Sequence, residues 1–235
     1  MKFERFYKSL IPMIGVMSFG LTYPVIAQSY MPMVAITPLP LNTSGARSGA
    51  TGAAAAPRRA EPVVQTTYRA QSAVTQRVKR QFTEFVGRNG GDAAGLAVAM
   101  EREDFFARWG RHVSSYGLRR GDAADAMTAY WMINWQIAND VTDVSRSQVL
   151  AVKRQVLAGM GADAGFSRLN DAEKQEMAEA LILNFIIQSV AYEDAMKAND
   201  AAMKGRLQSA SVARFRNETG VDLRRIRLTE TGFSS

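Results

Sequence analysis

Carboxyl groups are the side chains that this sequence supplies most generously for catalysis, because it has no cysteine and a single histidine. Asp122 and Asp125 lie three residues apart, and Glu193 and Asp194 are adjacent. Two such groups about 5–9 Å apart can cut a glycosidic bond, including those in the sugar chains of a cell wall. A carboxylate-dependent cell-wall (glycan) hydrolase is therefore one function that the sequence leaves open.

Each of these carboxyl groups also has a structural explanation. Asp122 precedes a helical pattern and can cap it, while Asp125 falls in the first turn, where the helix dipole favours an anion. Glu193 and Asp194 are typical of a solvated helix face. The sequence therefore favours a non-catalytic protein over an enzyme, and we predict no catalytic residue.

His112, the only histidine, has no neighbour at metal-ligand spacing. A zinc site built on it would need carboxylates for nearly all the other ligands, which is an uncommon set. No nucleophile-elbow pattern accompanies it, and the lack of cysteine removes thiolate catalysis and Cys-ligated zinc. We expect a surface or structural role for His112, and we predict no metal or cofactor site.

Aromatic side chains gather in two neighbouring segments of the sequence. They could line a groove that stacks on sugars or accepts a partner helix, but their helical spacing is more typical of a core. We favour the core for all six residues of this set: Phe105, Phe106, Trp109, Tyr130, Trp131 and Trp135.

Amide side chains interrupt faces that are otherwise apolar. A buried amide lowers stability unless it is hydrogen-bonded, so Asn134, Asn139, Asn184 and Gln188 need partners. We expect Asn134 to pair with Asn184 or Gln188 between two helices.

The elements that position these residues are predicted to be helices. Apolar side chains recur every three or four residues, and candidate caps precede several segments, including Asn170 with Glu173 in the form of a capping box. The fold class is all-α, a single bundle of six to seven helices in which residues 122–139 make the central one. Strand character is limited to residues 222–228. The predicted helices cover residues 67–86, 92–100, 105–117, 122–139, 145–160, 170 onward and 200–217.

The first 27 residues have the pattern of a secretory signal peptide. Three cations and one anion precede residues 10–21, which carry no charge. This apolar run is shorter than the roughly 20 residues of a spanning helix, and Pro12 and Pro24 would interrupt it. Val25 and Ala27 have the short side chains that signal peptidase reads, so we expect cleavage after Ala27. An uncleaved membrane anchor is the alternative.

The chain changes character at residue 62, because all seven prolines lie at or before it. Residues 28–62 are rich in Pro, Ala, Gly and Ser and cannot bury enough apolar surface to offset the entropy of ordering. We predict a disordered linker there, with residues 30–36 as an alternative short strand or docking peptide. Residues 63–235 are long enough for one helical domain.

The formal net charge of +7 is spread unevenly. The predicted signal peptide and linker contribute +2 each, which leaves +3 on residues 63–235. A nucleic-acid partner would need a dense basic face, and none is predicted. Basic clusters occur at Arg119-Arg120 and at residues 224–227, where a solvated face fits as well as contact with an anionic envelope surface.

Several short motifs occur together within residues 65–233: Gly117-Leu118, residues 122–126, Tyr130-Trp131, Trp135, Ala138-Asn139, residues 219–223, Leu228-Thr229 and Gly232-Phe233. In this combination the sequence resembles a family of exported Gram-negative bacterial proteins of unknown function. The resemblance implies an exported helical domain. It supplies no activity, cofactor or site residue.

The function predicted on these grounds is that of an exported binding or accessory protein of the bacterial envelope, periplasmic or secreted. Without cysteine there is no lipid anchor, so after signal cleavage we expect no integral membrane protein. The expected partner is an envelope protein or a polysaccharide, with anionic lipid as a further alternative. The glycan hydrolase stays the alternative function.

Overall fold

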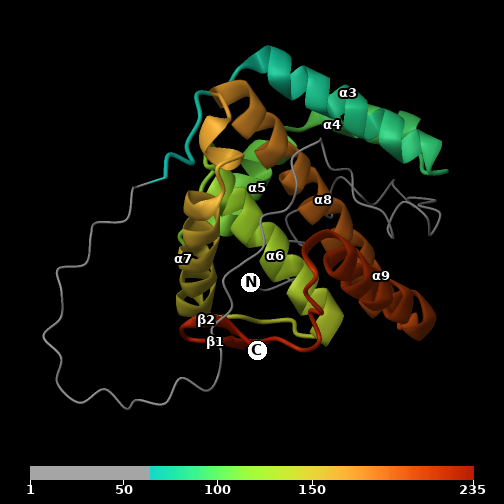
Figure 1. Cartoon of the computed structure of the whole chain (residues 1–235). Helices are drawn as coiled ribbons and strands as arrows, with labels where there is room; N and C mark the ends of the chain where they lie inside the picture. Colours follow the sequence, from blue (N-terminus) through green and yellow to red (C-terminus); the bar gives the residue numbers. More distant parts are fainter. Residues whose placement is uncertain (1–63) are drawn as a thin grey trace, which may run out of the picture.

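The computed structural model describes residues 64–235, so the predicted signal peptide (1–27), the linker (28–62) and the apolar island (30–36) lie outside the described residues. Seven packed α-helices and a small hairpin make up the described part, which confirms the all-α class (Figure 1). None of these helices is long and apolar enough to cross a membrane. The elements are α3 (Ser72–Arg88), α4 (Ala93–Arg102), α5 (Phe105–Ser114), α6 (Ala123–Asn139), α7 (Arg146–Ala162), the 3-10 turn η1 (Phe166–Arg168), α8 (Asp171–Lys197), α9 (Ala201–Thr219), β1 (Arg227–Thr229) and β2 (Gly232–Ser234).

Side-chain caps fix where the helices begin, as the sequence predicts. Asp92 caps α4, and Asp122 caps α6. Ser145 opens α7 with a full capping box, and Asn170 opens α8 with another, in which Glu173 returns the hydrogen bond. These four predicted starts are confirmed. They were predictable because a side-chain cap depends on residues only two or three positions away.

The first helix begins later than predicted, at Ser72 rather than at residue 67. Residues 64–71, here called the N-terminal arm, are not helical, and Thr67 forms an isolated antiparallel bridge with Asp122. The Ala123 N–H donates to the Thr66 carbonyl at 2.9 Å, and the Tyr68 N–H donates to the Gly121 carbonyl at 3.2 Å. This backbone pairing competes with a helical turn and displaces it.

Two helices, α6 and α8, form the centre of the bundle (Figure 1). Helix α6 packs against α7, α8 and α9, while α8 packs against α3, α5, α6 and α9. Nearly every side chain of α6 is buried, so the prediction of a central helix at residues 122–139 is confirmed. The 27-residue α8 shares that position, because it too is buried around most of its girth.

The chain ends in residues 220–235, here called the C-terminal strap, which leads from α9 to a hairpin at the end of the molecule opposite α3 (Figure 1). The predicted strand at residues 222–228 is displaced: β1 begins at Arg227 and pairs antiparallel with β2, with Leu228 opposite Phe233. Gly232 has φ +110°, and an added Cβ there would lie 2.3 Å from the Gln155 side chain. Any larger residue at position 232 would therefore displace the Gln155 side chain.

Candidate functional site

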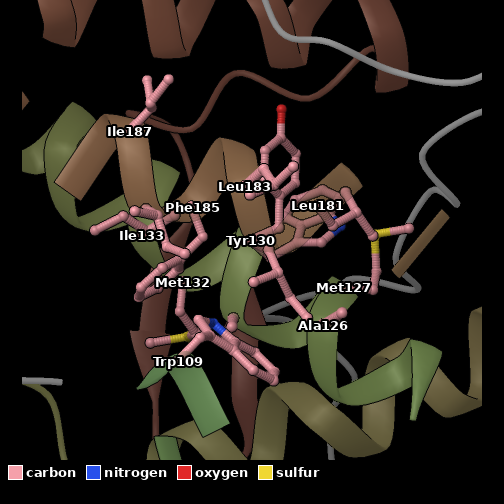
Figure 2. Close-up of a cluster of buried hydrophobic side chains, with 14 of the residues drawn as sticks. Trp109, Ala126, Met127, Tyr130, Met132, Ile133, Leu181, Leu183, Phe185 and Ile187 are labelled. Carbon is pink, nitrogen blue, oxygen red and sulfur yellow. The ribbon is translucent and has the colours of Figure 1, made fainter. Parts of the chain in front are cut away.

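The six aromatic side chains singled out from the sequence lie in the core. Figure 2 shows Trp109 of α5 and Tyr130 of α6 among apolar side chains of α6 and α8. The core interpretation is confirmed, and these rings are not available to line a groove. Each is at most 8% exposed: Phe105, Phe106, Trp109, Tyr130, Trp131 and Trp135.

Asp122 is fully engaged where the N-terminal arm meets α6. Its Oδ1 accepts hydrogen bonds from the Ala124 N–H at 3.1 Å and from the Thr66 hydroxyl at 2.7 Å. Its Oδ2 lies 3.4 Å from the Arg119 guanidinium. The predicted cap is confirmed, and the same carboxylate also holds the arm.

Asp125 is completely buried and joins α6 to α7. Its Oδ1 forms an ion pair with the Lys153 ammonium, and its Oδ2 accepts the Arg119 N–H at 3.0 Å. Burial raises the pKa of Asp125 above its usual 3.8, against the lowering effect of Lys153, and the nearby Asp122 carboxylate adds to the rise. Asp125 thus fastens two helices together.

Glu179 of α8 is a second buried carboxyl group, and no local sequence motif marks it. Its Oε1 accepts hydrogen bonds from the Thr75 hydroxyl at 2.8 Å and from Gln175 Nε2 at 3.0 Å. Its Oε2 is buried and has no hydrogen-bond partner among residues 64–235. Gln175 and Glu179 share one helix face because they are four residues apart, but only the packing of α3 shows that this face is buried.

The charged groups around the arm influence one another. Burial raises the pKa of Glu179 above its usual 4.5, although both of its hydrogen bonds and the Arg120 charge oppose the rise. Burial also raises the pKa of Tyr68, and the charge of Glu179 adds to that rise. We call Tyr68, Asp122, Asp125 and Glu179 the acidic cluster.

Glu193 is buried, although the sequence predicts a solvated position. Its side chain is only 3% exposed and belongs to the buried face of α8, whereas its neighbour Asp194 is half-buried. The predicted solvated face is therefore wrong for Glu193, while Asp194 is partly exposed. The reason is that α8 has helices on several sides, so its second half has little surface left to solvate.

His112 packs against aromatic rings. Its ring centroid lies 6.3 Å from that of Tyr116 and 6.2 Å from that of Phe185. Burial lowers the pKa of His112 to about 3, so the imidazole is neutral at physiological pH. This is a structural placement, in which the histidine contacts the side of α8.

The buried amides meet through an arginine rather than directly. Arg214 of α9 donates from Nη2 to Asn134 Oδ1 at 2.7 Å and to Gln188 Oε1 at 3.0 Å. Asn184 instead donates to the Ala180 carbonyl within its own helix. The expected direct pair is therefore wrong, because α9 inserts a guanidinium between α6 and α8.

The described residues hold no group of three or more His, Cys, Asp or Glu side chains that could bind a metal ion. Some of their buried carboxyl groups instead join one helix to the next. Asp125 and Glu179 illustrate this, since each contacts a different neighbouring helix.

Residues 35–235 match a protein family described as "Family of unknown function (DUF6683)". The chain belongs to this family. The match begins inside the predicted linker, so DUF6683 extends on the N-terminal side beyond the described residues. No curated protein and no solved structure matches the chain.

Several motif residues behind the resemblance meet at the C-terminal strap. Trp135 Nε1 donates to the Ile226 carbonyl at 3.1 Å, and Asn139 Nδ2 donates to the Leu223 carbonyl at 3.1 Å. The Phe233 ring lies 6.0 Å from that of Trp131 and 5.9 Å from that of Trp135. In this member of DUF6683 the recognisable motif therefore fastens the end of the chain to α6.

Proposed function

We propose that this DUF6683 protein is an exported, non-catalytic binding or accessory protein of the bacterial envelope. The observation that carries the proposal is how its reactive side chains are used. Asp122 and Asp125 hold α6 to its neighbours, Glu179 holds α8 to α3, and His112 packs against rings. Side chains that join structural elements in this way stabilise the fold. The surface of the domain is then the part that binds.

The glycan hydrolase is less well supported by the geometry. Asp125 and Glu179 have the raised pKa that a general acid requires, yet Asp125 is 0% and Glu179 1% exposed. A sugar chain would have to separate packed helices to touch either group. Both side chains also sit in hydrogen bonds or ion pairs that such a separation would break.

Export rests on the charged start, the apolar run and the short side chains before residue 28. N-terminal sequencing of the protein recovered outside the cytoplasm should give a chain that starts at Gln28. Membrane-bound protein that still begins at Met1 would overturn export by cleavage.

The non-catalytic assignment is tested with isolated cell-wall sacculi. We expect the protein to sediment with envelope material in a saturable manner and to release no soluble sugar fragments above the buffer control. Release of reducing ends that is lost in folded Glu179→Gln or Asp125→Asn variants would replace the proposal with the hydrolase. The matched control is Glu176→Gln, since Glu176 lies on the same helix and pairs with Arg77 at its surface.

A further inference from the structure

The described surface offers charge rather than apolar area. Among residues 64–235, Val98 is the one large hydrophobic side chain that is exposed. The two basic clusters seen in the sequence are the natural places to look for a partner, and their surroundings differ.

Carboxylates neutralise the first cluster. The Arg119 guanidinium lies 3.4 Å from Asp122, and that of Arg120 lies 3.1 Å from Asp104. Arg120 also stands 5.6 Å from the centre of the Phe106 ring. These arginines are already used within the fold.

The second cluster keeps its charge. Arg224, Arg225 and Arg227 are exposed, and none makes an ion pair with a carboxylate of residues 64–235. Asp222 stands next to them, but its Oδ2 binds the Arg216 guanidinium at 2.5 Å and its Oδ1 accepts the Arg224 N–H at 3.0 Å. Arg225 helps to lower the pKa of Asp222 without pairing with it.

The backbone that carries these arginines is held in place. Leu223 and Ile226 are buried, and their carbonyls accept the hydrogen bonds from Asn139 and Trp135. Buried anchors thus alternate with outward arginines along the strap. A surface fixed in this way loses little conformational entropy when it binds.

Guanidinium groups bind phosphate oxygens through two parallel N–H donors, so a cluster of unpaired arginines suits a phosphate-bearing partner. A polysaccharide is favoured less, because the rings that could stack on sugars are buried. A nucleic acid is favoured less, because residues 63–235 carry only +3. A short, rigid basic turn fits a flat anionic surface, where each arginine adds its own attraction.

We propose that Arg224, Arg225 and Arg227 form a docking surface for the phosphate groups of an anionic lipid membrane. This inference rests on the proposed envelope function and names the partner of that surface.

The test is vesicle sedimentation of the full chain with phosphatidylcholine alone and with added phosphatidylglycerol. The neutral vesicles report the contribution of the rest of the chain that does not depend on charge, and the paired variants separate this surface from the other cations of the chain. We expect extra binding to the anionic vesicles that falls as salt rises from about 10 mM to about 150 mM, which shortens the Debye length from about 30 Å to about 8 Å. In the Arg224→Gln/Arg225→Gln variant, the extra partitioning to anionic vesicles should be about 30-fold weaker than in the unmodified protein.

The matched control removes the same charge elsewhere: Arg119→Gln/Arg120→Gln should retain the extra partitioning within about twofold, because those arginines are already paired. Equal losses in the two variants, or no preference for anionic vesicles, would overturn the docking surface. Binding of inorganic phosphate or heparin through Arg224 and Arg225 without vesicle binding would also overturn it. Sedimentation with sacculi is a separate measurement that uses no lipid, so it tests the proposed function independently of the docking surface.

Discussion

Two buried glutamines hold the two ends of the described chain by the same geometry. At the N-terminal arm, Gln175 Oε1 accepts the Gln71 N–H at 2.8 Å while its Nε2 donates to the Gln71 carbonyl at 3.0 Å. At the C-terminal strap, Gln155 Oε1 accepts the Phe233 N–H at 2.7 Å while its Nε2 donates to the Phe233 carbonyl at 2.8 Å. Each side-chain amide takes the place of a neighbouring strand.

The surroundings of the two glutamines differ. Gln175 also donates to Glu179 and lies beside the acidic cluster, whereas Gln155 faces a residue packed between Trp131 and Trp135. The same pair of hydrogen bonds is thus surrounded by ionisable side chains at one end and by aromatic side chains at the other. The region of the arm should therefore lose stability as its buried carboxyl groups ionise, while the strap should owe most of its stability to packing.

The largest effect is expected from Phe233→Ala. Phe233 is fully buried between two tryptophans, and a Phe→Ala change in a core lowers the free energy of unfolding by about 3–5 kcal/mol. Urea unfolding followed by tryptophan fluorescence measures it. Glu230→Ala at the exposed hairpin tip is the control and should change stability by less than about 0.5 kcal/mol. A small loss for Phe233→Ala would mean that packing does not hold the strap.

Next come Gln155→Leu and Gln175→Leu, which test the two glutamines directly. Gln155→Leu leaves the Phe233 N–H and carbonyl unpaired. Gln175→Leu leaves the Gln71 N–H unpaired and removes a donor to Glu179, while the Gln71 carbonyl still accepts backbone N–H groups at the start of α3. The free energy of unfolding should fall by about 2–4 kcal/mol in each case. The sites lie on different helices, so the double variant should show additive losses within about 0.5 kcal/mol. Strong non-additivity would show that the two ends are coupled rather than held independently.

Asp122→Ala should have a smaller effect, about 1–2 kcal/mol, because it removes a helix cap and the acceptor for the Thr66 hydroxyl. Hydrogen exchange should increase most at the amides of the arm and of the first turn of α6. Asp92→Ala, which removes the exposed cap of α4, is the control. Faster exchange confined to α6 would contradict the role of Asp122 in holding the arm.

The smallest effect is expected from Glu179→Gln and concerns pH. The pKa of Glu179 is raised in the folded protein, so the unfolded chain ionises first as the pH rises above 4.5, and this group then lowers stability. Glu179→Gln should therefore be more stable than the unmodified protein at pH 7 and show no gain below pH 4.5. Urea midpoints across this range measure the difference.

Asp222 in the strap provides the opposite sign. Its pKa is lowered by the Arg216 hydrogen bond, so its contribution is present above pH 3.8 and is lost as the pH falls through the lower folded pKa. Asp222→Asn should therefore flatten only the acid limb of the stability profile. If both variants changed the same limb, the contrast between the two ends would be wrong.

Local features were predictable from the sequence. The caps at Asp122, Ser145 and Asn170 and the core placement of the aromatic residues are as predicted, because caps act over three residues and helical periodicity shows which face is apolar. The start of α3 and the exposure of Glu193 were not predictable in this way, since the arm and the surrounding helices override local preference.

The sequence by itself determined that residues 64–235 are mainly helical, where most of their helices begin and which aromatic side chains lie in the core. The tertiary structure alone decided which polar groups are buried together and which charged side chains stay exposed without an ion pair. Gln155 meets a residue 78 positions away, Gln175 one that is 104 away, and Arg214 one that is 80 away. No local pattern encodes such a meeting, because the free energy that favours it is gained only when distant elements pack and exclude water from the polar atoms between them.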